Sequence, residues 1–97
     1  MLFRSAFFLI EGTGTHKNSL DNAISSYAQD WDLDRMPAID LAIARIASFE
    51  ILYSDEVDDA VAIDEAVELA KEFSTEQSAN FLNGLLGRIL VVKDALA

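Results

Sequence analysis

Apolar side chains recur at intervals of three and four residues along almost the whole chain, and this spacing limits the possible folds more than any other feature. It is the period of an amphipathic α-helix, in which residues three and four apart share a face. Alternating patterns and β-branched runs bounded by turn residues, which indicate strands, do not occur in the sequence. We therefore predict an all-α bundle of four to five helices, forming a single helical domain over residues 1–97.

The first periodic segment has two interpretations. Its apolar residues keep one helical phase from Phe3 to Tyr27, across the polar stretch EGTGTHKNS. One interpretation is a single long first helix over 2–30, in which Gly12 and Gly14 allow close packing. The other is a pair of helices broken at Gly14. Because the phase is kept, we favour the single long helix.

Two further helices are predicted in the middle of the chain. The second helix covers 36–54, with Asp34 as its cap and Pro37 in the first turn, where a missing N–H costs little. Its buried stripe is expected to be Met36, Ile39, Ile43, Ile46, Ala47 and Leu52. The acidic stretch SDEVDDA reads as a loop, and a third helix follows over 61–73. Its buried face is expected to be Ile63, Ala66, Val67, Ala70 and Phe73.

The fourth helix, over 74–90, contains an unusual set of residues. Ser74 and Gln77 fit a capping box, and Ser78 could instead cap the helix one turn later. Four poor helix formers fall on one face, namely Asn80, Asn83, Gly84 and Gly87. Each Gly costs about 1 kcal/mol relative to Ala in a helix interior. We therefore expect this small polar face to lie close to another backbone segment or to a polar ligand.

Charge and composition exclude several classes of protein. Seventeen acidic against seven basic residues give a net charge of −10, which should repel a polyanion at long range. The chain has no Cys, which excludes disulfides and thiolate metal sites. The longest apolar run, 6–10, is too short for a membrane span or a signal peptide, so we expect a cytoplasmic protein without membrane contact.

Catalytic and metal-binding patterns are weak. His16 is the only histidine, and a surface role on a helix explains it better than catalysis. The stretch GTGTHKNS lacks the Gly before Lys that a phosphate-binding loop needs. The acidic residues of 55–59 lack the spacing and the Gly of an EF-hand. We therefore predict no catalytic residues, no metal site and no cofactor, and a protein that is not an enzyme.

Three stretches carry a resemblance to a known family. They are DWDLDRMPAIDLAIARIASFEILY, VAIDEAVELAKEFSTEQSANFLNGLLGR and, upstream, LIEGTGTHKNSLDNAI. Together they resemble the C-terminal half of the NusB family of bacterial transcription antitermination factors, from about Phe3 to Ile89. The resemblance implies a NusB-like C-terminal subdomain with a long first helix.

The function that the resemblance implies is RNA and protein binding. Such a protein binds boxA RNA of ribosomal RNA operons together with NusE, a ribosomal small-subunit protein, and joins the RNA polymerase antitermination complex. The family's N-terminal half, with its arginine-rich first helix, is not matched by this sequence, and Asn80 and Leu41 stand where the family has basic residues. We therefore expect weak RNA binding by the chain alone. The alternative is a helical accessory or protein-interaction domain, as in ribosomal RNA cytosine-5 methyltransferases, with RNA binding lost by truncation.

Particular residues follow from the resemblance by position. The RNA-binding residues would be Gln77, Ser78, Asn80 and Phe81. From spacing alone, Phe81 fits either a core position or a platform on which a base stacks. Asp40 and Arg45 would bind NusE. Asp40 falls away from the Ile39–Ile43–Ile46 stripe, so we expect it to be exposed.

The segment AFFLI also suggests self-association. It places apolar side chains on all sides of the first helix, and a helix that is apolar all round needs cover all round. We therefore predict a homo-oligomer whose interface contains Phe7, Phe8 and Leu9.

Overall fold

The computed structural model describes residues 12–28, 33–54 and 57–96. All regular structure in these ranges is helical, which confirms the predicted fold class. The elements are α2 (Lys17–Tyr27), the short 3-10 helix η1 (Leu33–Arg35), α3 (Ala38–Tyr53), α4 (Asp59–Phe73), α5 (Glu76–Val91) and the single turn α6 (Lys93–Leu96). Within these ranges no helix has the length and apolar character needed to cross a membrane.

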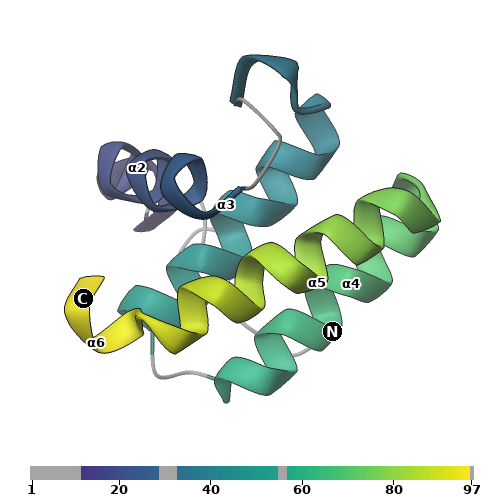
Figure 1. The fold of residues 1–97 in the computed structure, drawn as a ribbon. Coiled ribbons are helices and arrows are strands. Elements are labelled where there is room, and N and C mark those ends of the chain that lie inside the picture. Colours follow the sequence, from purple (N-terminus) through teal and green to yellow (C-terminus); the bar gives the residue numbers. More distant parts are fainter. Residues whose placement is uncertain (1–11, 29–32, 55–56, 97) are drawn as a thin grey trace.

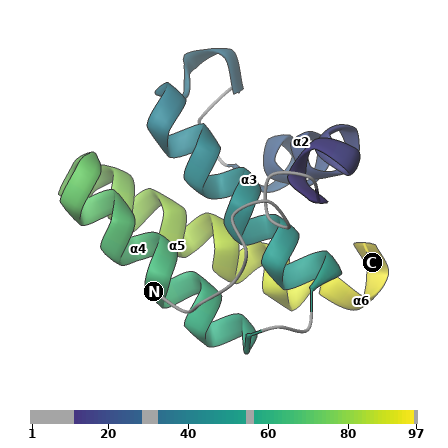
Figure 2. The ribbon, with the colours of Figure 1, turned by 180° about the vertical axis from the view of Figure 1, so that it is seen from behind.

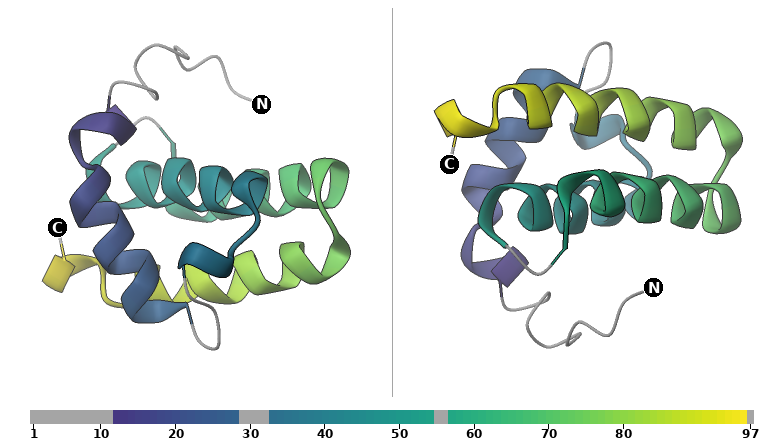
Figure 3. Two further views of the ribbon diagram at one scale, coloured as in Figure 1. Left: turned by 90° about the horizontal axis from the view of Figure 1, so that it is seen from above. Right: turned by 90° about the horizontal axis from the view of Figure 1, so that it is seen from below.

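The helices form a bundle around α5. In Figure 1, α4 and α5 lie side by side and run in opposite directions, joined by a tight corner. Seen from behind in Figure 2, α3 packs across both of them. Figure 3 shows α2 crossing the ends of this group at a steep angle. Helix α5 therefore contacts all three of the other long helices.

The core is built mainly from aliphatic residues and alanine. In α5 the fully buried side chains are Ala79, Leu82, Leu85, Leu86 and Ile89. Each buried Leu or Ile contributes about 1.5–3 kcal/mol relative to an exposed position. The alanines of the neighbouring helices are small enough for the helix backbones to approach closely, and they include Ala23, Ala44, Ala47, Ala62, Ala66 and Ala70.

The first turn of α3 differs from the prediction. Ile39 was expected to be buried, but 43% of it is exposed, whereas Asp40 is only 3% exposed. The buried face continues from Met36 through Asp40 to Ile43, which are spaced by four and three residues, and so Ile39 lies beside it. The predicted cap Asp34 is also wrong, because Pro37 occupies the N-cap position of α3.

The end of α4 corrects a second prediction. Ile63, Ala66 and Ala70 are buried as expected, but Phe73 is 61% exposed. By the helical period Phe73 falls on the same side of α4 as Ala62 and Ala66, so its exposure comes from its place as the last residue of the helix and not from its rotation. Phe73 therefore points outward at the corner where the chain enters α5.

The beginning of the described chain is nearly continuous helix. Residues 12–15 are helical, a turn falls at His16, and α2 follows to Tyr27. The interruption is thus at His16 and not at Gly14, and hydrogen bonds from His16 N to Gly12 O and from Leu20 N to His16 O span it. Residues 2–11 and 29–30 of the predicted long helix lie outside the described residues.

Gly12 is in close contact with the core, as the long-helix interpretation proposed. A Cβ built at Gly12 would lie 2.2 Å from Phe49 Cζ, which no real packing allows. A Cβ at Gly14 would meet no atom of the described part of the chain within 4 Å. The close-packing explanation is therefore right for Gly12 and wrong for Gly14.

Candidate functional site

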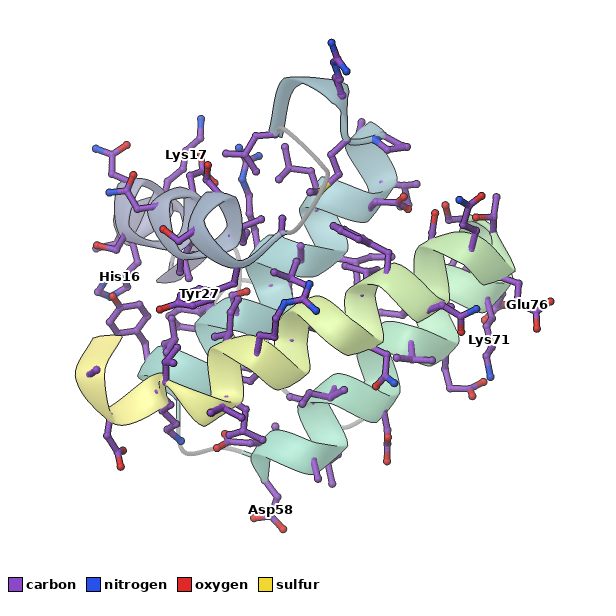
Figure 4. All side chains as sticks on the ribbon, in the orientation of Figure 1. His16, Lys17, Tyr27, Asp58, Lys71 and Glu76 are labelled. Atoms are coloured by element: carbon purple, nitrogen blue, oxygen red, sulfur yellow. The ribbon has the colours of Figure 1, made fainter. Side chains whose placement is uncertain are left out.

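A pocket of about 220 Å³ lies between the start of α3 and the start of α5. We call it the α3–α5 pocket, and its lining residues are Met36, Pro37, Asp40, Ser74, Thr75, Gln77, Ser78 and Phe81. The labelled Glu76 and Lys71 in Figure 4 mark the corner between α4 and α5, and Asp58 marks the opposite end of α4. The positive end of the α5 dipole thus lies at one side of this pocket.

The corner is organised by three hydroxyl groups. Thr75 is the N-cap of α5, and its Oγ1 accepts a hydrogen bond of 2.9 Å from Ser78 N. The cap is therefore Thr75, and neither Ser74 nor Ser78 as predicted. Ser78 Oγ accepts hydrogen bonds from Ser74 Oγ at 3.1 Å and from Thr75 Oγ1 at 2.9 Å. All of these bonds hold the first turn of α5 in place.

Asp40 joins this network from the neighbouring helix. Ser78 Oγ donates a hydrogen bond of 2.6 Å to Asp40 Oδ2. The expectation that Asp40 is exposed is wrong, because its carboxylate is turned inward to receive this bond. The positive end of α5 and the short bond from Ser78 together compensate part of the cost of burying the charge. The other oxygen, Oδ1, is buried and, within the described ranges, has no hydrogen-bond partner.

The structure brings most of the predicted RNA-binding residues to this pocket. Gln77, Ser78 and Phe81 line it, whereas Asn80 is exposed and is not part of the lining. The Ser78 hydroxyl already forms hydrogen bonds with three partners, and one of them is Asp40. Gln77 is exposed, and Phe81 is half-buried in the pocket wall and also packs against the core.

Arg45 lies elsewhere. Five residues along a helix rotate the side chain by roughly 140°, so Arg45 and Asp40 do not share a face of α3. Arg45 Nε and Nη2 donate to Asp21 Oδ1 and Oδ2 at 2.8 and 3.0 Å, which ties α3 to α2. This side-chain hydrogen bonding with Asp21 raises the pKa of Arg45 above its ordinary value. The two residues that the resemblance assigns to NusE binding are therefore separated in the structure.

Among the described residues, the polar face of α5 does not meet the backbone of another segment, which the sequence had led us to expect. Asn80 and Asn83 are exposed, and a Cβ at Gly87 would meet nothing within 4 Å. Gly84 leaves room for a side chain of its own helix, since a Cβ there would lie 3.2 Å from Arg88 Nη1. Arg88 Nε donates a hydrogen bond of 2.8 Å to the carbonyl oxygen of Tyr27 at the end of α2.

The remaining candidates lie away from the pocket. The His16 ring stacks on Tyr53 near the other end of α3, with ring centroids 4.0 Å apart. Phe7, Phe8 and Leu9, the predicted oligomer interface, lie outside the described residues. In the part of the chain that the structure describes, no three His, Cys, Asp or Glu side chains are grouped to hold a metal ion.

Met36, Pro37 and Thr75 line the pocket but were not predicted from the sequence as site residues. The doublet Ser74-Thr75 offered a signal for Thr75, because Thr75 precedes Ser78 by the three residues that separate an N-cap from N3. Met36 and Pro37 gave no such signal, since only the approach of α5 to the start of α3 makes them part of a pocket.

Comparisons with known proteins agree on one family. The model of the NusB family matches residues 4–91. The transcription antitermination protein NusB of Salinispora arenicola is 62% identical over 81 residues, which cover 84% of this chain and 60% of the relative. That of Kineococcus radiotolerans is 47% identical over 92 residues, covering 95% of this chain and 68% of the relative.

A solved structure gives the same result for the fold. The structure of T. maritima NusB matches this chain with a TM-score of 0.80 and 37% sequence identity. The match covers 86% of this chain and 58% of the T. maritima chain. The described helices thus correspond to somewhat more than half of that protein.

Proposed function

Because the chain belongs to the NusB family, we propose that it is a transcription antitermination factor that binds boxA RNA of ribosomal RNA operons together with NusE. Its role is binding and not catalysis, within the RNA polymerase antitermination complex. The relatives reported above carry the antitermination name, which favours this role over that of an accessory domain of a ribosomal RNA methyltransferase.

The observation that supports the RNA contact most directly is the α3–α5 pocket. Three of the four residues that the resemblance assigns to RNA lie in its lining, namely Gln77, Ser78 and Phe81. The pocket combines an aromatic ring with the N-terminal end of α5, where backbone N–H groups favour an anion such as a phosphate. Single-stranded RNA offers both groups, since its unstacked bases can pack on aromatic side chains.

The protein contact is proposed at a different place on α3. Arg45 keeps 26% of its side chain exposed although it is paired with Asp21, and we assign NusE binding to this exposed part. Asp40 acts on NusE binding indirectly, by holding the start of α5 against α3.

A titration with fluorescently labelled boxA RNA tests the proposal. The chain with a net charge of −10 should bind weakly alone at about 0.15 M salt, because charge repulsion opposes the contact. With equimolar NusE, binding should become at least about tenfold tighter than with either protein alone. If NusE and the chain together bind boxA RNA no better than NusE does alone, the proposed function is wrong.

A further inference from the structure

The α3–α5 pocket contains a buried acceptor that the fold itself does not use. Asp40 is 3% exposed, and only its Oδ2 is hydrogen-bonded. Its Oδ1 is shielded from solvent and has no hydrogen-bond partner among the residues that the structure describes. An unpaired acceptor on a buried carboxylate is unfavourable, and a ligand that brings an N–H donor relieves this cost.

We propose that the α3–α5 pocket binds one unstacked nucleobase that presents an exocyclic amino group to Asp40 Oδ1. Cytosine N4, adenine N6 and guanine N2 are such amino groups, whereas uracil has no exocyclic amino group. This inference rests on the proposed RNA binding and adds a base preference to it. It also gives Asp40 a role in RNA binding, where the resemblance implied a role in protein binding.

The surroundings of Asp40 favour a base over a cationic side chain of a partner protein. A Lys or Arg in the pocket would place its positive charge beside the positive end of α5. A nucleotide avoids this repulsion, because its amino group is neutral and its phosphate carries a negative charge that suits the helix end. One nucleotide therefore satisfies both the carboxylate and the helix end.

The walls of the pocket also suit a base. Met36, Pro37 and Phe81 provide apolar surface, and Phe81 provides the ring on which a base can stack. Because Oδ1 is shielded in the empty pocket, a ligand that reaches it must displace part of the wall. Phe81 is the largest side chain in that wall and is only half-buried, so its rotation is the simplest way to open the site.

The test compares, by NMR, how tightly the full chain binds two short RNAs. We would titrate the 97-residue chain with octamers of cytidylate or uridylate at about 0.05 M salt, where weak binding is strongest. The cytidylate octamer should bind about tenfold more tightly, as expected for one hydrogen bond to a charged group. The chemical shifts of Ser78 and Phe81 should change most.

Two variants identify the group that reads the base. Asp40→Asn keeps the shape and can still accept from Ser78, but it presents an amide N–H₂ where Oδ1 was. It should lose the preference for cytidylate or reverse it toward uridylate. Asp58→Asn removes the same charge from an exposed N-cap at the far end of α4, whose side chain makes no capping bond. This control variant should bind both octamers more tightly by the same factor, so the tenfold ratio of their affinities should be kept.

The possible results separate the inference from the proposed function. Equal binding of the two octamers by the unmodified chain would overturn the base preference and leave RNA binding in place. An unchanged ratio in Asp40→Asn, or shifts located away from Ser78 and Phe81, would do the same. Absence of binding to either octamer by the chain would overturn the base preference, and absence of binding to boxA RNA with NusE present as well would overturn both. The comparison in the unmodified chain needs no variant, so it decides the question even if Asp40→Asn does not fold.

Discussion

Ser78 on α5 and Asp40 on α3 are joined by a hydrogen bond of 2.6 Å, and this bond fixes the corner where the candidate site lies. The two residues are 38 positions apart in the sequence. Ser78 also receives bonds from Ser74 and Thr75, so the N-cap of α5 and the carboxylate of Asp40 form one connected group. A change in one member should therefore affect both the stability of the corner and ligand binding.

The first prediction concerns the burial of Asp40. Asp40→Lys should lower the free energy of unfolding by about 3 kcal/mol or more, because it buries an unpaired ammonium group beside the positive end of α5. For a domain of this size the melting temperature should fall by more than about 10 °C. Asp40→Asn, which can still accept from Ser78, is the control and should lose much less. Equal melting temperatures for Asp40→Lys and the unmodified chain would mean that Asp40 is exposed in solution.

The second prediction compares two glycines two residues apart. Gly12→Ala should destabilise the fold by about 1–3 kcal/mol, because the added Cβ collides with the ring of Phe49. Gly14→Ala meets open space in a helical stretch, so it should be neutral or stabilise the fold by up to about 1 kcal/mol. Urea unfolding of both variants measures the difference. If the two substitutions have the same effect, the close contact of Gly12 with Phe49 is not present in solution.

The third prediction concerns the ion pair between α2 and α3. Arg45→Lys should cost about 0.5–1 kcal/mol, because Lys cannot form the two parallel bonds to Asp21 and the pair is partly exposed. Lys71→Gln, which removes a more exposed pairing with Glu68 at 3.9 Å, should change stability by less. Chemical denaturation of both variants distinguishes the two pairs.

The direction in which the pKa of Arg45 is shifted determines how the stabilisation by the Arg45–Asp21 pair depends on pH. A pKa that is higher in the folded state means that the stabilisation is complete below the unfolded pKa of Arg45 and is lost only as the pH rises through the folded pKa. Both values lie far above neutrality. The difference in stability between Arg45→Lys and the unmodified chain should therefore stay constant between about pH 6 and 9. A difference that disappears at pH 9 would contradict the assigned cause.

The helical period predicted the elements well because most of the buried stripes obey it. Ile63, Ala66 and Ala70 in α4, and Ile43, Ala47 and Leu52 in α3, are buried as the spacing required. Ile39 and Asp40 were assigned to the wrong sides, because hydrophobicity alone decided between neighbouring positions. The partner that draws Asp40 inward, Ser78, is distant in the sequence, and no local pattern could reveal it.

The candidate site could be predicted only in part, for a related reason. Gln77, Ser78 and Phe81 are close in sequence and could be found as a group, by resemblance. That Asp40 belongs with them depends on how α3 and α5 pack. Similarly, the sequence did not show that the Arg45 side chain is paired with Asp21 of α2, because this pairing depends on how α2 packs against α3.

The fourth prediction concerns self-association of the chain through residues that lie outside the described ranges. The apolar residues Phe7, Phe8 and Leu9 remain a proposed interface between copies of the chain. Phe8→Glu should convert an oligomer into a monomer or an insoluble protein, because it places a charge in an apolar contact. Analytical ultracentrifugation is the measurement. A well-folded monomer of the unmodified chain at high concentration would refute the proposal.

RNA binding at the α3–α5 pocket can be tested directly with two phenylalanines of the same chain. Phe81 is half-buried in the pocket, whereas Phe73 is 61% exposed at the end of α4 and is not part of the lining. The measurement is the affinity for boxA RNA in the presence of NusE, for Phe81→Ala and Phe73→Ala, with circular dichroism to verify folding. Phe81→Ala should weaken binding by about tenfold or more, as expected for the loss of one stacked base, and Phe73→Ala should bind like the unmodified chain. Unchanged affinity in a folded Phe81→Ala would contradict the assignment of RNA binding to this pocket.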